Sequence, residues 1–236
     1  MLFSSDVSAQ GVELTTAVNH VGHAAVFNLL LPLLKRSGAR VVSVGSNLHK
    51  DGKAGPGIAF GARAPHLLSG ASPPARSARL HAHFSLPAAA GSGNAAYGDS
   101  KLLTVAWAFE VQRRYGADGV SCASVDPGVA PFTGLGPKAA WVTALRWTLV
   151  PFVLMPLLFL VGLGQTPSGG GGAEVAALDA AISGDCVYFF KTKPGPVSEQ
   201  ARDKALGKHV WAETQSLLRK LSAEHGINPA IALSDV

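Results

Sequence analysis

Strand-like and helical segments alternate along this chain of 236 residues. Short runs rich in β-branched and apolar residues predict strands at residues 40–45, 119–125 and 187–190. Helical patterns are expected at residues 12–36, 95–115, 140–163, 173–182 and 198–222. Such alternation is typical of a parallel sheet whose two faces are covered by helices. With three strands predicted, the first is expected at an edge of the sheet.

The composition favours one folded domain over residues 1–236, because 47% of the residues are hydrophobic and 15% are charged. Cys122 lies in a predicted strand and Cys186 directly precedes another, so both are expected as buried thiols, as in an intracellular compartment. The formal charge of +5 is spread along the chain without interleaved aromatic residues. This pattern argues against a nucleic-acid partner.

Tyr97 and Lys101 are four residues apart in the predicted helix 95–115, so they share one face of it. An ammonium beside a phenol lowers the pKa of the phenol toward a value useful in proton transfer. Ser46 follows the strand 40–45, where an open α/β sheet presents polar groups to ligands, and Ser43 is the alternative for the same role. Asn19 lies near the start of the helix 12–36, and its alternative role is a helix cap.

In this order, Asn19, Ser46, Tyr97 and Lys101 resemble the motif residues of the short-chain dehydrogenase/reductase family. The similarity to its retinol-dehydrogenase-like branch is carried by three segments, at residues 18–23, 96–102 and 127–129. A protochlorophyllide-reductase-like group on the same fold is resembled as well, at residues 44–46, 113–115 and 133–135. The resemblance covers most of residues 11 to 221.

The resemblance implies an α/β fold, a three-layer Rossmann-like parallel sheet with helices on both faces. It also implies hydride transfer between a nicotinamide ring and an alcohol or carbonyl carbon. Tyr97 would exchange the hydroxyl proton, and Lys101 would lower its pKa and hold the nicotinamide ribose. Ser46 would hydrogen-bond the substrate oxygen, and Asn19 would anchor a water that relays protons.

The cofactor implied by the resemblance is NADP(H), with NAD as the alternative. The residues that would contact it, besides Tyr97 and Lys101, follow the strand 119–125 and are Pro127, Gly128, Val129 and Thr133. The glycine-rich turn with which the family binds the pyrophosphate is missing from the sequence, and the glycines at 169–172 favour a flexible linker. We therefore expect an N-terminally truncated, C-terminal portion of the fold, short of roughly 80 residues.

Two segments interrupt the resemblance. Residues 52–93 are rich in Ala, Gly, Pro and Ser without an acidic residue, which predicts a low-complexity, disordered insertion. Its histidines, at positions 66, 81 and 83, have no carboxylate or cysteine nearby, so no metal site is expected. Residues 141–164 are strongly apolar and predict a substrate lid or a membrane-associated helix.

The expected function is an NADP(H)-dependent oxidoreductase that acts on a hydrophobic alcohol or carbonyl compound, such as a retinoid, steroid or fatty aldehyde. The alternatives are a protochlorophyllide-reductase-like enzyme and a truncated, non-catalytic remnant that acts only through a partner. Competence as an enzyme depends on the missing cofactor loop. Expected partners are the small hydrophobic substrate, a membrane surface and a second copy of the chain. Membranes of the endoplasmic reticulum or of a plastid are the candidate intracellular locations.

Overall fold

The computed structural model describes residues 8, 12, 14–54, 93–128, 157, 160, 171–178 and 184–232. The predicted disordered insertion therefore lies outside the described residues from position 55 to position 92. The predicted lid or membrane helix lies outside them too, apart from the two single positions 157 and 160.

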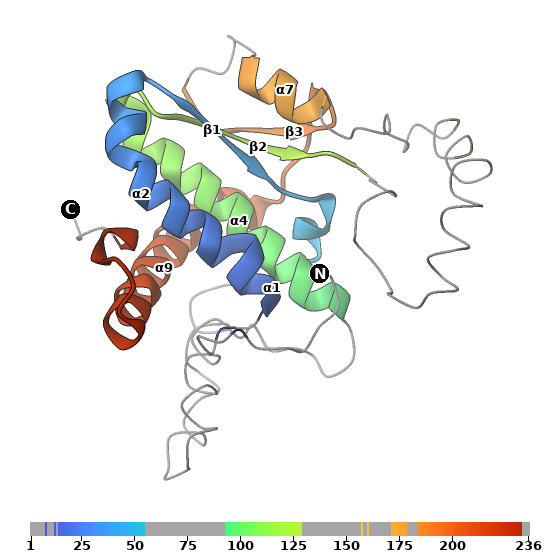
Figure 1. Cartoon of the computed structure of the whole chain (residues 1–236). Helices are drawn as coiled ribbons and strands as arrows, with labels where there is room; N and C mark the ends of the chain where they lie inside the picture. The colour runs from blue at the N-terminus through green and yellow to red at the C-terminus, as the bar shows by residue number, and fades with distance from the viewer. Residues whose placement is uncertain are drawn as a thin grey trace.

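The centre of the fold is a four-stranded sheet in the order β1-β2-β3-β4. Its three longer strands are labelled in Figure 1. The strands are β1 (Arg40–Val44), β2 (Ser121–Asp126), β3 (Val187–Phe190) and β4 (Lys193–Pro194). The first three are parallel, with Arg40 opposite Ser121 and Ala123 opposite Val187. Within the described part of the chain, β1 forms an edge of the sheet, as predicted.

The short strand β4 is a correction to the predicted all-parallel sheet, because it pairs with β3 in the antiparallel direction. The chain reverses at Lys191, a non-glycine residue at φ 58°. The backbone amide of Gly195 then donates to the Tyr188 carbonyl at 2.9 Å and closes the turn. The sheet is therefore mixed, although its three longer strands keep the parallel arrangement.

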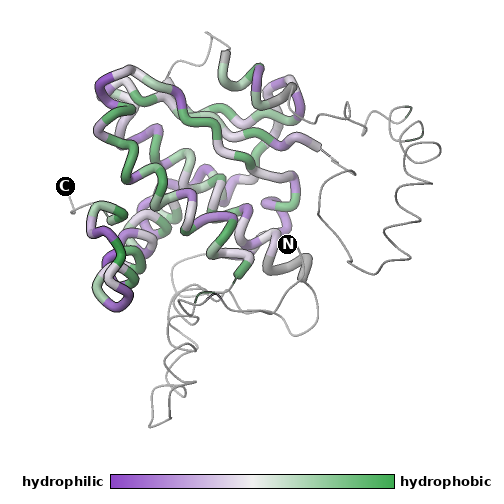
Figure 2. Tube along the Cα trace, in the orientation of Figure 1, coloured by the Kyte–Doolittle hydropathy of each residue, from purple (hydrophilic) through white to green (hydrophobic). Residues whose placement is uncertain are grey.

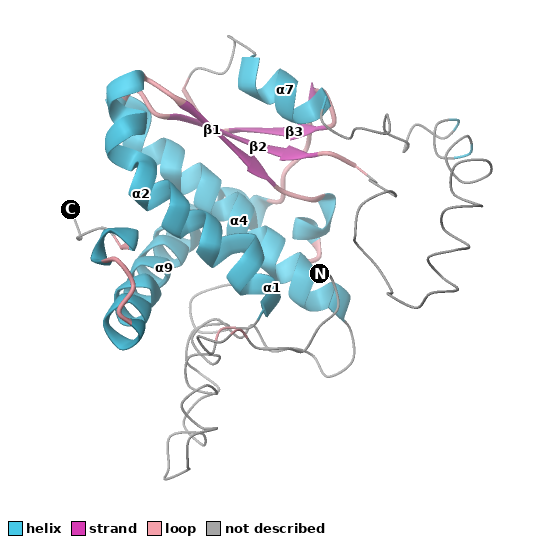
Figure 3. Ribbon diagram, in the orientation of Figure 1, coloured by secondary structure: helices cyan, strands magenta, loops and turns pink. Residues whose placement is uncertain are grey.

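The helices form two layers, one on each face of the sheet (Figure 3). The described helical elements are α1 (Leu14–Thr16), the π-helical η1 (Ala17–Val21), α2 (Gly22–Ser37), η2 (Asn47–Lys50), α4 (Gly93–Tyr115), η4 (Gly116–Asp118), α7 (Gly171–Leu178), α8 (Glu199–Arg202), α9 (Lys204–His225) and η6 (Pro229–Ile231). Helices α2, α4 and α9 lie on one side of the sheet, and α7 contacts β1, β2 and β3 from the other. The expected three-layer Rossmann-like α/β fold is confirmed.

Alternating side chains of the strands serve two separate cores, because successive residues of a strand point to opposite faces. Cys122 belongs to the larger core, shared with α2, α4 and α9. Ala123 belongs to a smaller one, which includes Phe189 of β3 and Ala176 of α7. Figure 2 shows apolar positions along the parallel strands and on the helices that pack against them.

Helix α4 is the central helix of the larger layer. Every residue from Gly98 to Val111 is buried, so this helix has no solvent-facing stripe over three turns. Its Trp107 packs edge-on against Phe27 of α2 at 5.0 Å and stacks with Trp211 of α9 at 6.4 Å between ring centroids. This packing places α4, whose N-terminal part carries Tyr97 and Lys101, beside the sheet.

Local capping explains where the C-terminal helices begin. The Ser198 hydroxyl accepts from the Ala201 amide and starts α8, and the Asp203 carboxylate accepts from the Ala205 amide and starts α9. The single helix expected at 198–222 is therefore two helices. Its break falls at Asp203, whose backbone is extended (φ −61°, ψ 122°).

Helix α2 exposes several large apolar side chains, namely Val26, Leu29, Leu30 and Leu33, and Val18 of η1 is exposed as well. The continuous helical segment Leu14–Ser37 has the length and the mean hydropathy, 1.4, of a membrane-crossing helix. Core helices of soluble proteins can have the same length and mean hydropathy. Part of this segment is core here, since Ala24, Phe27 and Leu31 are buried.

Candidate active site

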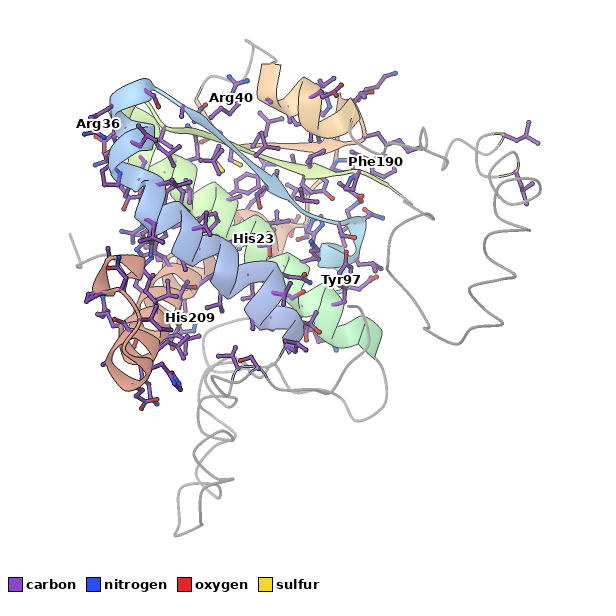
Figure 4. The ribbon with its side chains drawn as sticks, in the orientation of Figure 1. His23, Arg36, Arg40, Tyr97, Phe190 and His209 are labelled. Carbon is purple, nitrogen blue, oxygen red and sulfur yellow. The ribbon has the colours of Figure 1, made fainter. Side chains whose placement is uncertain are left out.

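Tyr97 lies in the N-terminal half of α4 (Figure 4), and Lys101 follows one turn later in the same helix. The Lys101 ammonium lies 5.5 Å from the centre of the Tyr97 ring. Its nitrogen donates to the backbone carbonyl of Val44, the last residue of β1, at 2.8 Å. The lysine is only 7% exposed, so this hydrogen bond compensates part of the cost of burying its charge.

Ser46 follows β1 and caps η2, where its hydroxyl accepts from the Leu48 amide at 3.3 Å. The Ser46 hydroxyl also lies close enough to the Tyr97 phenol to lower its pKa. Ser43, the alternative considered for this role, lies within β1 opposite Ser124. The structure therefore brings Ser46 into contact with the phenol.

Burial raises the pKa of Tyr97, while the nearby Ser46 hydroxyl lowers it and the charge of Asp126 raises it further. The net direction is opposite to the predicted lowering by Lys101. The physical reason is that the phenol is largely removed from water and that the lysine nitrogen is directed at the Val44 carbonyl. Burial also lowers the pKa of Lys101 to about 8, against the opposing effect of Asp126.

Asn19 lies in the π-helical turn η1, beside α4. Its side-chain amide donates to the Ser100 hydroxyl at 3.0 Å. Its backbone carbonyl accepts from the Thr104 hydroxyl at 3.1 Å and lies 3.0 Å from Nδ1 of His23. The observed contacts of Asn19 thus join it to the helix of Tyr97 and Lys101, and its role in a proton relay remains a prediction.

The turn after β2 contains the predicted cofactor residues Pro127 and Gly128. Gly128 has φ 77°, a left-handed conformation that favours glycine. Its amide donates to the Asp126 carboxylate at 2.6 Å, which fixes the turn beside the strand end. Val129 and Thr133, the other predicted cofactor contacts, lie outside the described residues.

Two buried residues of this site have no assigned role in the sequence interpretation. Asp126 ends β2, and its carboxylate accepts from the backbone amides of both Asn47 and Gly128. A local signal for it exists, since an aspartate commonly accepts from the amide two residues on in a turn. The contact with Asn47 joins residues 79 positions apart, and no local sequence pattern predicts it.

His49 is the second such residue. Its Nε2 accepts from the Ser198 amide at 3.1 Å, so the proton of the neutral ring lies on Nδ1, which donates to the Ser46 carbonyl at 2.6 Å. Burial lowers the pKa of His49 and favours this neutral form. The ring thereby links the loop of Ser46 to the start of α8. A histidine three residues after a serine carries no specific signal of such a contact.

Close backbone contact positions η2 against α4. A Cβ atom on Gly52 would lie 2.6 Å from the Gly98 carbonyl oxygen and 2.8 Å from Cβ of Leu102. The Lys53 amide donates to the Asp99 carboxylate at 2.7 Å and fastens the same segment to the helix. Glycine is required at position 52 because the two backbones touch there.

The described residues fit the reactive end of a nicotinamide nucleotide. Tyr97, Lys101 and the Pro127–Gly128 turn lie where adjacent parallel strands end, the edge at which open α/β sheets bind their ligands. Lys101 would hold a ribose hydroxyl, and the turn would face the nicotinamide ring. No cluster of three or more potential metal ligands occurs among the residues that the structure describes.

The comparisons with known proteins agree with this arrangement. No family model matches the chain. It is 28% identical over 226 residues to a protochlorophyllide reductase of Avena sativa, covering 89% of this chain and 68% of the relative. It is 30% identical over 220 residues to retinol dehydrogenase 12 of Mus musculus, covering 89% and 56%. The short chain dehydrogenase/reductase dpchH of Colletotrichum higginsianum is 27% identical, with coverage of 92% and 51%.

A solved structure of an uncharacterized protein from Mycobacterium paratuberculosis shares the fold, with a TM-score of 0.51 and 22% identity over 90% of this chain and 61% of that one. Fold and site thus define a Rossmann-like α/β protein with a Tyr-Lys pair at the strand ends. The curated relatives that it matches are members of the short-chain dehydrogenase/reductase family, which confirms the predicted resemblance. It spans about half to two thirds of the length of these curated relatives.

Proposed function

We propose that this protein is an oxidoreductase that transfers a hydride between NADP(H) and a hydrophobic alcohol or carbonyl compound. The observation that carries the proposal is the contact of Tyr97 with Ser46 beside the buried Lys101, at the carboxyl ends of two parallel strands. The relatives named as retinol dehydrogenases and protochlorophyllide reductases support the reaction class.

The bound nicotinamide would supply or accept the hydride at the substrate carbon. Tyr97 would give its phenolic proton to the substrate oxygen during reduction and take it back during oxidation. Ser46 would donate a hydrogen bond to the same oxygen and orient it toward Tyr97. Lys101, which holds its position through the Val44 carbonyl, would stabilise the phenolate that remains after the proton has left.

The protonated Tyr97 is suited to act as the acid when a carbonyl is reduced. The pKa of Tyr97 is raised, chiefly by burial, so the phenol keeps its proton at neutral pH and is ready to act as an acid. Oxidation of an alcohol needs the phenolate instead, and burial disfavours that form.

Apolar side chains on both sides of Ser46 support a hydrophobic substrate. Val44 is 49% exposed and Leu48 is 40% exposed, although both are large apolar residues. A retinoid, steroid or fatty aldehyde would cover them. A protochlorophyllide-like pigment is the second candidate, supported by the Avena sativa relative. The exposed leucines of α2 support the proposed contact with a membrane surface or with a second copy of the chain.

The test is consumption of NADPH in the presence of a retinal, a fatty aldehyde, a ketosteroid or protochlorophyllide, followed by the nicotinamide absorbance. We expect turnover with at least one of these substrates and its loss in Tyr97→Phe, with NADPH affinity nearly unchanged. Tyr115→Phe is the matched control, because Tyr115 ends the same helix and packs against Trp211 rather than Ser46. Equal turnover in the Tyr97→Phe variant would contradict the mechanism. No turnover by the native protein with any substrate would favour a non-catalytic role.

A further inference from the structure

Asp126 joins two parts of the candidate site that come from different strands. It is the last residue of β2 and is only 4% exposed. Its Oδ2 accepts from the amide of Asn47, the residue directly after Ser46. Its Oδ1 accepts from the amide of Gly128, in the turn that follows β2. One carboxylate therefore holds both the backbone after Ser46 and the turn at Gly128 at the end of β2.

We propose that Asp126 is a positioning residue of this site. It holds Ser46 and Gly128 in place beside Tyr97 and Lys101. This positioning role rests on the proposed oxidoreductase function, whereas the two contacts exist whatever the protein does. Asp126 does not exchange a proton with the substrate in this scheme. It acts through the backbone of its neighbours.

A carboxylate suits this position better than an amide. Two separate N–H groups point at the side chain, and an ionised aspartate offers an acceptor oxygen to each of them. An asparagine has one acceptor oxygen, so its NH2 group would face one of the two donors. The hydrogen bonds to the charged group are also stronger than bonds between neutral groups.

The charge of Asp126 affects the ionisation of its neighbours. The titratable groups on which it acts are Tyr97, Lys101, Tyr188 and His49. The two tyrosines have raised pKa values and His49 a lowered one, so at neutral pH these three are uncharged. Lys101 is the cation among these four groups, and the charge of Asp126 raises its pKa. Removal of the negative charge would make the protonated lysine less stable.

The experiment compares Asp126→Asn and Asp126→Glu with the native chain by amide hydrogen exchange and by NMR titration of the Lys101 side chain. Asp118→Asn is the control, because it removes the same charge from an exposed pair with Lys35. We expect the Asn47 and Gly128 amides to be protected in the native protein and to exchange about tenfold faster or more in Asp126→Asn. The pKa of Lys101 should fall below its native value.

Asp126→Glu separates position from charge. Its longer side chain keeps the negative charge but cannot meet both amides from the same backbone, so faster exchange with little change in the Lys101 titration is expected. The Asp118→Asn control should change neither the exchange of the Asn47 and Gly128 amides nor the titration of Lys101. Unprotected Asn47 and Gly128 amides in the native chain would overturn the inference, as would native-like exchange in Asp126→Asn.

Activity separates this inference from the proposed function. If the native protein reduces a carbonyl substrate, both Asp126 variants should lower kcat, because they misplace Ser46 beside Tyr97, and should raise KM for NADPH, because they release the Gly128 turn. Undiminished kcat in an Asp126→Asn protein with fast-exchanging amides would refute the positioning role while leaving the oxidoreductase proposal intact. If the native protein shows no turnover but its amides respond as expected, only the oxidoreductase proposal is refuted.

Discussion

Replacement of Lys101 by methionine should change how the stability of the protein depends on pH. The lysine has a pKa lowered from 10.5 to about 8, chiefly because it is buried. In the unfolded chain it keeps its proton up to its ordinary pKa. Between pH 8 and 10.5 the unfolded state therefore binds more protons than the folded state, and the free energy of unfolding rises with pH.

The size of the rise follows from the pKa difference. Each pKa unit is worth about 1.4 kcal/mol, so the full change from 10.5 to about 8 corresponds to about 3 kcal/mol. Lys101→Met has no group to titrate there and should lack this rise. Tyrosines and Cys186 with raised pKa values titrate in an overlapping range, but they do so in both proteins. The difference between the two curves isolates Lys101.

Urea unfolding of both proteins at a series of pH values from 7 to 10.5 is the assay. The native protein should gain about 3 kcal/mol over Lys101→Met across the range above pH 8. Lys35→Met is the control, since Lys35 is exposed and its hydrogen bond with Asp118 raises its pKa. That variant should keep the gain that Lys101 provides. Parallel curves for the native protein and Lys101→Met would refute the reasoning that burial destabilises the charged lysine.

Two further predictions concern the packing around the site. Gly52→Ala should destabilise the protein by about 1–3 kcal/mol in urea unfolding, because its Cβ would meet the Gly98 carbonyl. Gly22→Ala, whose Cβ would lie 3.3 Å from the nearest oxygen, is its control, and equal effects would contradict the close-contact argument. His20 is buried and its pKa is lowered to about 3, so protonation favours unfolding and stability should fall by about 5 kcal/mol from pH 6.5 toward pH 3. His20→Gln should flatten that decline; an unchanged slope would show that other groups cause it.

Much of the secondary structure could be predicted because its signals are local. The strand at 187–190 has the predicted bounds, and α4 begins two residues before the predicted helix. Apolar periodicity reports which side of a segment will be buried, without any knowledge of its partner. The expected helix at 198–222 was wrong in one respect, since the caps at Ser198 and Asp203 start two helices.

The candidate site could be predicted only in part. The four-residue spacing of Tyr97 and Lys101 places them on one helix face by geometry alone. The choice of Ser46 over Ser43 as the partner of Tyr97 depends on how the chain leaves β1, and spacing does not report it. The roles in catalysis that the resemblance implies for Asn19, Ser46, Tyr97 and Lys101 remain predictions.

The sequence by itself determined the alternation of the three longer strands with helices, the Tyr-Lys pair and the resemblance to the family, since each depends on residues close together in the chain or on similarity along it. Only the tertiary structure decided that the pKa of Tyr97 is raised rather than lowered, because burial depends on everything packed around the phenol. It alone joined Asp126 to Asn47 and His49 to Ser198, contacts between residues 79 and 149 positions apart. Such contacts arise when separate strands and helices meet, and no local pattern encodes them.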